Sequence, residues 1–146
     1  MQVFIIGSVY DTAKALDPKR LNKQIVECDQ ILDAIWEYST AWANHPVTLM
    51  YKKHTQWLVC YKRALLSYKA GHTKDFEFYS RACKSLTPSF HIPEYFDQMK
   101  RRLYTKDNTY YKQWKHLGES EINWYFVDNN WRYYKNGKQL KKLKYE

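Results

Sequence analysis

Four polar side chains with complementary chemistry lie close together in the segment LDPKRLNKQIVECDQIL (residues 16–32). Two are cations (Arg20 and Lys23), one is an amide (Gln24) and one is a carboxylate (Glu27). If the segment is helical, Arg20, Gln24 and Glu27 share one narrow face, because residues advance by about 100° around a helix axis. Lys23 lies beside that face. Such cations can hold phosphates, the amide can orient a base or ribose edge, and the carboxylate can manage a proton.

The helix that must position these side chains has a clear sequence signature. Asp11 or Asp17 can cap a helix here, and Pro18 occupies the first turn, where proline is favoured. Its apolar stripe predicts a helix running to about Tyr38; the stripe is Leu21, Ile25, Cys28, Leu32 and Ile35. The polar face flanks this stripe. It therefore lies at the edge of the surface that packs against the rest of the protein, where it can line a cleft. The alternative is a charge network of the kind found on ordinary helices.

A second candidate motif is WANHP (residues 42–46). His45 directly precedes Pro46 at an expected helix start, where free backbone N–H groups can hold an anion. A histidine in this position can donate to a phosphate or act as an acid or base. The simpler interpretation is a histidine that bonds its own backbone.

The third candidate is the basic and aromatic stretch QMKRRLYTKDNTYYKQW (residues 98–114). Arg102 and Lys106 share one face if the helix persists that far. Tyr110, Tyr111 and Trp114 follow, and such rings can stack on nucleobases. Packing into the core explains the same aromatic residues equally well.

The remaining pattern predicts a mainly helical, compact bundle with a small C-terminal β-meander. Residues 3–8 form a short extended segment, and one helix is expected from Pro46 to about Tyr68, ended by Gly71. Further helices are expected over residues 73–86 and from Pro93 to Tyr104. Strand-like runs joined by DNN and NG occupy residues 121–144, and Asn-Gly is a strong hairpin signal. The predicted units are a helical domain, 1–118, and a β-appendage, 119–146.

Composition narrows the class of partner. The chain has 146 residues, a formal net charge of +9 and 18% aromatic residues, which favours a polyanion such as nucleic acid or a nucleotide. Cys28, Cys60 and Cys83 are widely spaced and are expected to be reduced and buried. The apolar opening MQVFIIGSVY is too short for a membrane span or a secretion signal. We therefore expect a cytoplasmic protein with no membrane partner.

Several common catalytic signatures are missing from the sequence. It has no GxGxxG, P-loop, HExxH, GxSxG or CxxC motif. The expectation is therefore a site without a cofactor and without a metal.

Taken together, three segments resemble the pyrimidine-dimer DNA glycosylase (endonuclease V) family, and in particular its uncharacterised phage and bacterial branch. They are LDPKRLNKQIVECDQIL, WANHPVTLMYKKHTQWLVCYKRALLSYKAGH and RRLYTKDNTYYKQW. The resemblance covers roughly residues 1–115, and the tail from Glu119 has no counterpart in it.

This resemblance implies a helical DNA-repair glycosylase and AP lyase that binds duplex DNA and flips a base out. In the family, an N-terminal α-amine attacks the sugar C1′ while a glutamate of the first helix assists. Carried over to this chain, the glutamate is Glu27 and the amine belongs to Met1. The same resemblance assigns phosphate contacts to Arg20 or Lys23 and to Arg102 and Lys106. An α-amine suits this chemistry because its pKa near 8 leaves a neutral fraction at physiological pH.

Residue 2 departs from the family pattern. Catalytic members expose a small residue after Met removal, whereas here Gln2 is bulky and favours retention of Met1. Either Met1 is the nucleophile, or the protein is a glycosylase without a lyase step. The alternative function is a non-catalytic protein that sequesters a free nucleotide in the same pocket. A third alternative is sequence-independent DNA binding through the aromatic tail.

Overall fold

The computed structural model describes residues 1–119, 123–135 and 138–139. The prediction of a mainly helical chain with a small C-terminal sheet is confirmed. In chain order the elements are α1 (Val9–Ala15), α2 (Pro18–Ile35), α3 (Pro46–Tyr51), α4 (Thr55–Ala70), α5 (Thr73–Ser85), α6 (Pro93–Lys106), the 3₁₀ helix η1 (Lys112–Leu117), β1 (Asn123–Val127), β2 (Asn130–Lys135) and β3 (Lys138–Gln139).

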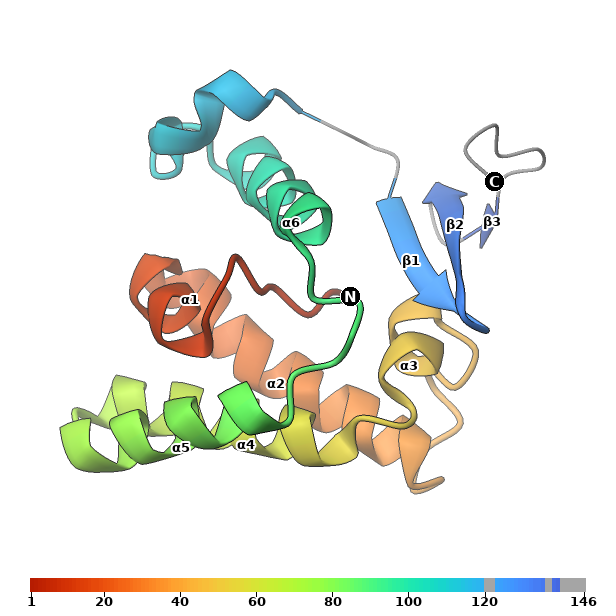
Figure 1. Cartoon of the computed structure of the whole chain (residues 1–146), viewed down its shortest axis with the longest axis horizontal. Coiled ribbons are helices and arrows are strands. Elements are labelled where there is room, and N and C mark those ends of the chain that lie inside the picture. The colour runs from red at the N-terminus through yellow and green to blue at the C-terminus, as the bar shows by residue number, and fades with distance from the viewer. Residues whose placement is uncertain (120–122, 136–137, 140–146) are drawn as a thin grey trace.

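The N-terminal segment runs extended through the core before the first helix. Val3, Phe4 and Ile5 are all at most 3% exposed, in line with the expected packed extended segment. Ser8, rather than an aspartate, caps α1 and accepts a hydrogen bond from the backbone N–H of Asp11. Figure 1 shows the N-terminus, where this segment begins, near the middle of the molecule.

Helix α2 begins where predicted, with Asp17 at the N-cap position and Pro18 in the first turn, but the Asp17 side chain makes no capping hydrogen bond. Its buried face packs on α4. The helix ends at Ile35, three residues before the predicted end, and Glu37 then takes a positive φ of 64°. That left-handed residue turns the chain away from the helix axis.

The prediction of one helix from Pro46 to Tyr68 is wrong. The chain forms α3 and α4 instead, with a break at residues 52–54 and His54 as the N-cap residue of α4. Tyr51 and Trp57 are both almost fully buried and stack with ring centroids 5.5 Å apart. In a continuous helix these positions would lie about 120° apart around the axis. The break allows both rings to enter one core.

Helices α4 and α5 form a hairpin across Gly71, whose φ of 76° provides the left-handed turn that glycine favours. Helix α6 continues to Lys106, two residues beyond the predicted end. It therefore carries Gln98, Arg102 and Lys106 in successive turns on one face. The aromatic stretch after it, which had no clear periodicity, folds in part as η1.

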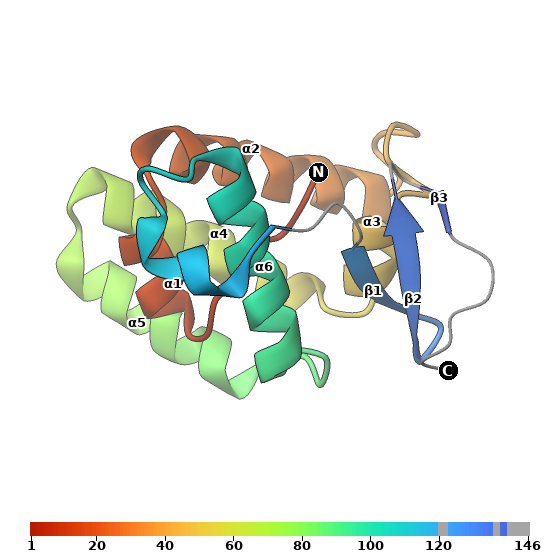
Figure 2. The same cartoon turned by 90° about the horizontal axis from the view of Figure 1, so that it is seen from above.

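The C-terminal sheet is antiparallel with the order β1-β2-β3. Asp128 and Asn129 join β1 to β2 in a two-residue turn, with φ values of 54° and 62° that match a type I′ hairpin. The predicted Asn-Gly turn and most of the last run lie outside the described residues. Figures 1 and 2 show the sheet beside α3, at the opposite end of the molecule from α5.

The described part of the chain contains no helix that is both long and apolar enough to cross a bilayer. The three cysteines are free, as expected; Cys28 and Cys83 are buried and Cys60 is half-buried.

The core contains a histidine whose titration links stability to pH. His91 lies among aromatic rings, with its Nε2 2.7 Å from the Tyr51 hydroxyl oxygen. Burial lowers the His91 pKa from 6.5 to about 3. Below pH 6.5 the unfolded chain therefore binds a proton that the folded chain does not, and stability falls as the pH falls.

We expect this histidine to remove about 2 kcal/mol of unfolding free energy between pH 6.5 and about pH 5. His91→Gln, which does not titrate in this range, should flatten that part of the profile in urea unfolding. His72→Gln is the matched control, because His72 is exposed. Equal slopes for the two variants would contradict the assignment.

Candidate active site at the N-terminus

The α-amine of Met1 faces the carboxylate of Glu27. The amine nitrogen lies 3.7 Å from Glu27 Oε2, and the Glu27 side chain is 8% exposed. The same carboxylate oxygen accepts a hydrogen bond of 3.2 Å from the backbone N–H of Gln2. Glu27 thus orients both the amine and the first peptide bond.

A second residue of α2 holds the segment that carries the amine. Gln24 is fully buried; its Oε1 accepts a 2.5 Å hydrogen bond from the Phe4 N–H, and its Nε2 donates to the Gln2 carbonyl at 2.9 Å. The Tyr61 hydroxyl also donates to the Phe4 carbonyl. The side-chain amide therefore pairs with the backbone much as a neighbouring strand would. Gln24 lies behind the site and positions it.

The amine and Glu27 open into a pocket of about 120 Å³ between α2 and α6. Its polar rim consists of cationic side chains from these two helices: Lys19, Arg20, Lys23, Arg102 and Lys106. The structure thus brings together six of the residues singled out in the sequence, namely Met1, Arg20, Lys23, Glu27, Arg102 and Lys106. An excess of cations over one carboxylate makes the pocket suited to an anion.

The electrostatics of the pocket favour a neutral amine. Burial lowers the pKa of the Met1 amine below its ordinary 8.0, and the charges of Lys106, Lys23 and Arg102 lower it further. Glu27 acts in the opposite direction. The Lys106 pKa is also lowered, by burial first and then by its cationic neighbours. The net result is an amine whose nucleophilic form is more populated near neutral pH than that of a free chain end.

Arg20 is fixed in place by the elements around it. Its guanidinium lies 3.3 Å from the Asp17 carboxylate and 4.0 Å from that of Asp107, and donates to the Lys106 carbonyl at 3.4 Å. These contacts join the start of α2 to the end of α6. Arg20 therefore fixes the position of α2 relative to α6 at the rim of the pocket.

His45 lies to one side of this pocket. Its Nδ1 accepts a 3.1 Å hydrogen bond from the Val47 N–H, so it caps α3 in the manner of the simpler interpretation. Burial first, and then the nearby charge of the Met1 amine, lower the His45 pKa from 6.5 to about 4. At neutral pH the ring is uncharged, which limits it to a neutral hydrogen-bonding role.

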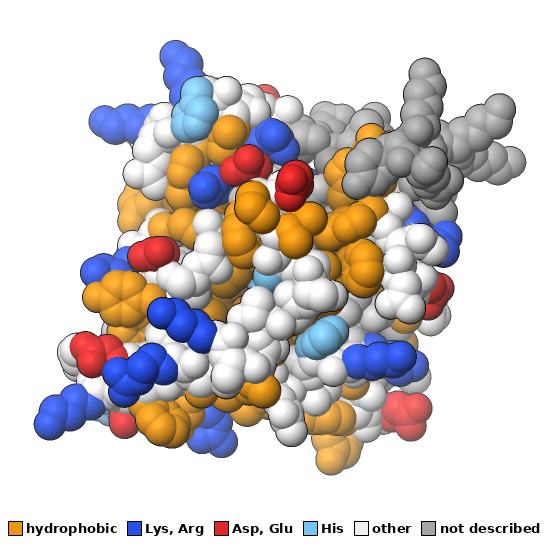
Figure 3. Space-filling model, in the orientation of Figure 1, with side chains coloured by type: hydrophobic (Ala, Val, Ile, Leu, Met, Phe, Trp, Pro, Cys, Tyr) orange, Lys and Arg blue, Asp and Glu red, His pale blue; other side chains and the backbone are white. Residues whose placement is uncertain are grey.

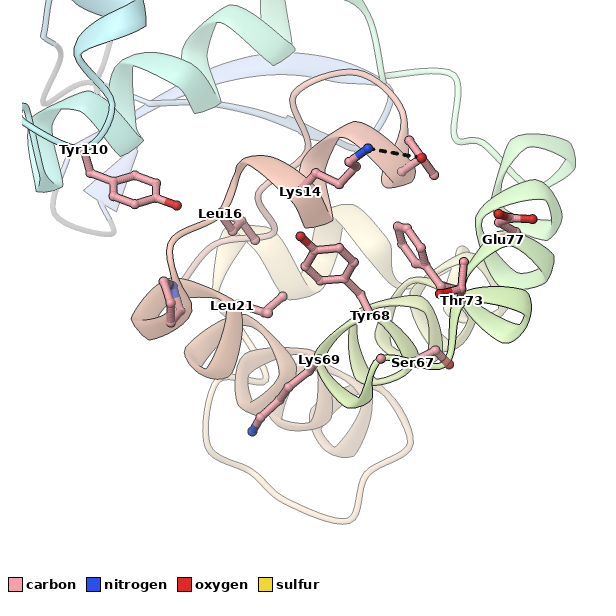
Figure 4. A pocket seen from close by; sticks show the side chains of 13 residues that line it. Lys14, Leu16, Leu21, Ser67, Tyr68, Lys69, Thr73, Glu77 and Tyr110 are labelled. Carbon is pink, nitrogen blue, oxygen red and sulfur yellow. Dashed lines mark hydrogen bonds between the residues drawn. The ribbon is translucent and has the colours of Figure 1, made fainter.

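The two candidate tyrosines are separated by the fold. Tyr111 is fully buried; its hydroxyl donates to the Asp17 carboxylate and accepts 2.9 Å from the Asp17 N–H. Tyr110 is half-exposed and lines a different, larger groove of about 620 Å³. Figure 4 shows Tyr110 pointing toward Leu16 and Leu21 across that groove. Neither Glu27 nor the amine borders it.

Three residues of the site were not singled out in the sequence. Lys19 lines the pocket, and its step of four to Lys23 and of eight to Glu27 would have indicated the shared face. Gln2 was considered only for its size, yet its side chain is 3% exposed and bonded to Tyr125. Tyr125 gave no local signal because it approaches from the C-terminal sheet.

The arrangement places an amine, which can act as a nucleophile, beside a carboxylate and among cations that can hold an anion. Within residues 1–119, 123–135 and 138–139, no group of three or more His, Cys, Asp or Glu side chains could hold a metal ion.

Removing the amide of Gln24 should loosen the segment that presents the amine. Gln24→Leu leaves the Gln2 carbonyl and the Phe4 N–H without their partner, which should cost about 2 kcal/mol of unfolding free energy. Lys23→Leu places the same side chain one residue earlier, at an exposed position, and serves as the control in urea unfolding. A Gln24→Leu variant as stable as Lys23→Leu would show that the hydrogen bonds of Gln24 do not hold the N-terminal segment in place.

The comparisons with known proteins concern the same part of the chain. A family model described as pyrimidine dimer DNA glycosylase matches residues 1–67, which include Met1, the cationic face of α2 and Glu27. Neither the curated proteins nor the solved structures gave a match. The match confirms the resemblance seen in the sequence, and it supports a glycosylase type of function with DNA as partner. Residues 1–67 of the chain are therefore similar to the pyrimidine dimer DNA glycosylase family.

Proposed function

We propose that this protein is a DNA glycosylase that flips a damaged or modified pyrimidine out of duplex DNA and releases it through an imine. The observation that carries the proposal is the Met1 amine, 3.7 Å from the Glu27 carboxylate in a pocket lined by five cations. The family match to residues 1–67 supports it independently.

The Met1 amine is the nucleophile in this proposal. In its neutral form it attacks C1′ of the flipped nucleotide, so a nitrogen–C1′ bond forms while the bond from C1′ to the base breaks. The base leaves with the bonding electrons and takes up a proton. The amine nitrogen loses a proton as the sugar ring opens to the imine, with the ring oxygen protonated. The lowered pKa of the amine supports attack near neutral pH.

Glu27 has two tasks in this chemistry. Its carboxylate accepts the proton that the attacking amine must lose, for which the 3.7 Å separation needs only a small approach. Its negative charge also stabilises the positive charge that develops on the sugar as the base departs. Because the same oxygen holds the Gln2 N–H, the carboxylate remains aimed at the amine.

The cations of α2 and α6 bind the DNA backbone on either side of the amine. Lys19, Lys23 and Lys106 extend from the rim, whereas Arg20 is held by carboxylates and joins the two helices. Pockets that enclose a small-molecule ligand measure about 300–1,000 Å³. At about 120 Å³, this pocket is smaller than such ligand pockets.

Glu27→Gln removes the proton acceptor and should slow base release from a duplex carrying a pyrimidine dimer by about 10²–10⁴-fold. The amide keeps the size of the side chain, so affinity for the duplex should change little. Base release is measured in single-turnover reactions and affinity by fluorescence anisotropy. Asp29→Asn is the control, because it makes the same change on α2 at a carboxylate paired with Lys62, away from the pocket.

A Glu27→Gln variant that loses affinity and base release to the same extent would contradict the catalytic role. Stabilisation of the fold by short free nucleotides, with none by duplex DNA, would instead favour sequestration.

The phosphate contacts make a separate prediction about salt. Log K for duplex binding should fall linearly with log salt concentration, and Lys23→Ala and Lys106→Ala should each reduce the slope by about 1. Lys84→Ala, near the end of α5, should leave the slope unchanged. A slope that depends equally on all three lysines would indicate diffuse charge attraction and not a docked duplex.

A further inference from the structure

The C-terminal sheet touches the residue next to the proposed nucleophile. The Gln2 side chain is 3% exposed, and its Nε2 donates a 2.6 Å hydrogen bond to the hydroxyl of Tyr125 in β1. The oxygen of that amide, Gln2 Oε1, is buried and has no hydrogen-bond partner among the described residues. The contact with Tyr125 is therefore what fixes the direction of the Gln2 side chain.

Strand β1 is itself anchored to the helix that lines the pocket. The Gln98 side chain accepts a 2.6 Å hydrogen bond from the Trp124 N–H and donates one of 2.9 Å to the Trp124 carbonyl. Gln98 lies one turn before Arg102 on α6. The same helix face thus holds the strand at one end and supplies pocket cations at the other.

The alternation of β1 directs Tyr125 inward. Tyr125 and Val127 are at most 5% exposed, whereas Trp124 borders an open groove between α6 and the sheet. Figure 3 shows hydrophobic side chains gathered on that groove face. The Tyr125 ring also meets His45 edge-on at 6.2 Å, so the strand closes the site on the side of α3.

The charges around the Tyr125 hydroxyl connect it to the pocket. Burial raises its pKa, and Glu27 raises it further, while Arg102 and the bond from Gln2 act in the opposite direction. Tyr134, from β2, also raises it slightly and packs against the ring at 5.2 Å. The hydroxyl stays protonated at neutral pH and lies within the field of both the proton acceptor and a pocket cation.

We propose that Tyr125 is a positioning residue for the amine of Met1, acting through the side chain of Gln2. The inference rests on the proposed function and adds a part of the chain that the family match does not include, since that match ends at residue 67. Gln24 and Glu27 hold the backbone of residue 2, and Tyr125 holds its side chain. With three attachments, residue 2 presents the preceding amine to the pocket in one orientation and keeps it buried.

The length of the Gln2 side chain is what allows this contact. A small side chain at this position would not reach the Tyr125 hydroxyl. The hydrogen bond between the C-terminal sheet and the side chain of residue 2 would then be lost. In this chain the sheet is thus part of the active site and not merely an appendage to the helical body.

The test is the pKa of the Met1 amine, measured in the full-length protein by competitive acetylation across pH and mass spectrometry of the N-terminal peptide. Tyr125→Phe keeps the ring and removes the hydroxyl. It should raise the amine pKa toward the ordinary 8.0, because a less firmly held amine is better hydrated. Tyr134→Phe makes the same change on the neighbouring strand and should leave the profile as in the wild type.

Gln2→Met removes the same hydrogen bond from the other side while keeping a bulky residue 2. Its acetylation profile should match that of Tyr125→Phe, and the double variant should add nothing further. This second variant separates loss of the contact from a local packing defect at the sheet.

Base release provides the second readout. With the pyrimidine-dimer duplex, Tyr125→Phe should slow release about tenfold without weakening duplex binding, since the loss is one of orientation. A wild-type protein that releases no base would disprove the proposed function, but the acetylation profiles would still test the positioning role. A Tyr125→Phe profile identical to that of the wild type would overturn it.

Discussion

The site depends on one buried amide, that of Gln24. An extended chain end that runs through a helical core needs partners for its backbone groups, because unpaired buried N–H and C=O groups are costly. Among the residues that the structure describes, no neighbouring strand provides them, and the side chain of Gln24 does so for residues 2 and 4. The amine of Met1 is placed against Glu27 as a result, and the rest of the pocket is arranged around that position.

The cations at the rim of the pocket have two effects in the proposed function. In the proposed function Lys23, Arg102 and Lys106 bind phosphates of the DNA, and the same charges lower the pKa of the Met1 amine. Burial also lowers this pKa. Glu27 raises it, because its negative charge stabilises the protonated amine. Affinity for a polyanion and nucleophilicity of the chain end therefore arise from one charge distribution. Removing a single cation changes both properties.

The sequence predicted the helical body, the small sheet and six residues that meet at the pocket. Five of them lie on α2 and α6, whose helical periodicity is local information, and Met1 was implied by the family resemblance. It could not show that Gln24 and Arg20, on one face, have different roles; that depends on where the extended segment crosses α2. Likewise, Tyr110 and Tyr111 are adjacent, yet only one is buried. The break before α4 and the approach of Tyr125 are tertiary effects, set by ring packing and by a strand far away in the chain.

The most direct measurement is borohydride trapping of the protein on duplex DNA that carries an abasic site, followed by peptide mapping of the adduct. We expect a covalent adduct on the α-amine of Met1, because that amine lies beside Glu27 and its pKa is lowered. Blocking the N-terminus should abolish the adduct. An adduct on a lysine of the rim, or no adduct from the folded protein, would contradict the proposed function.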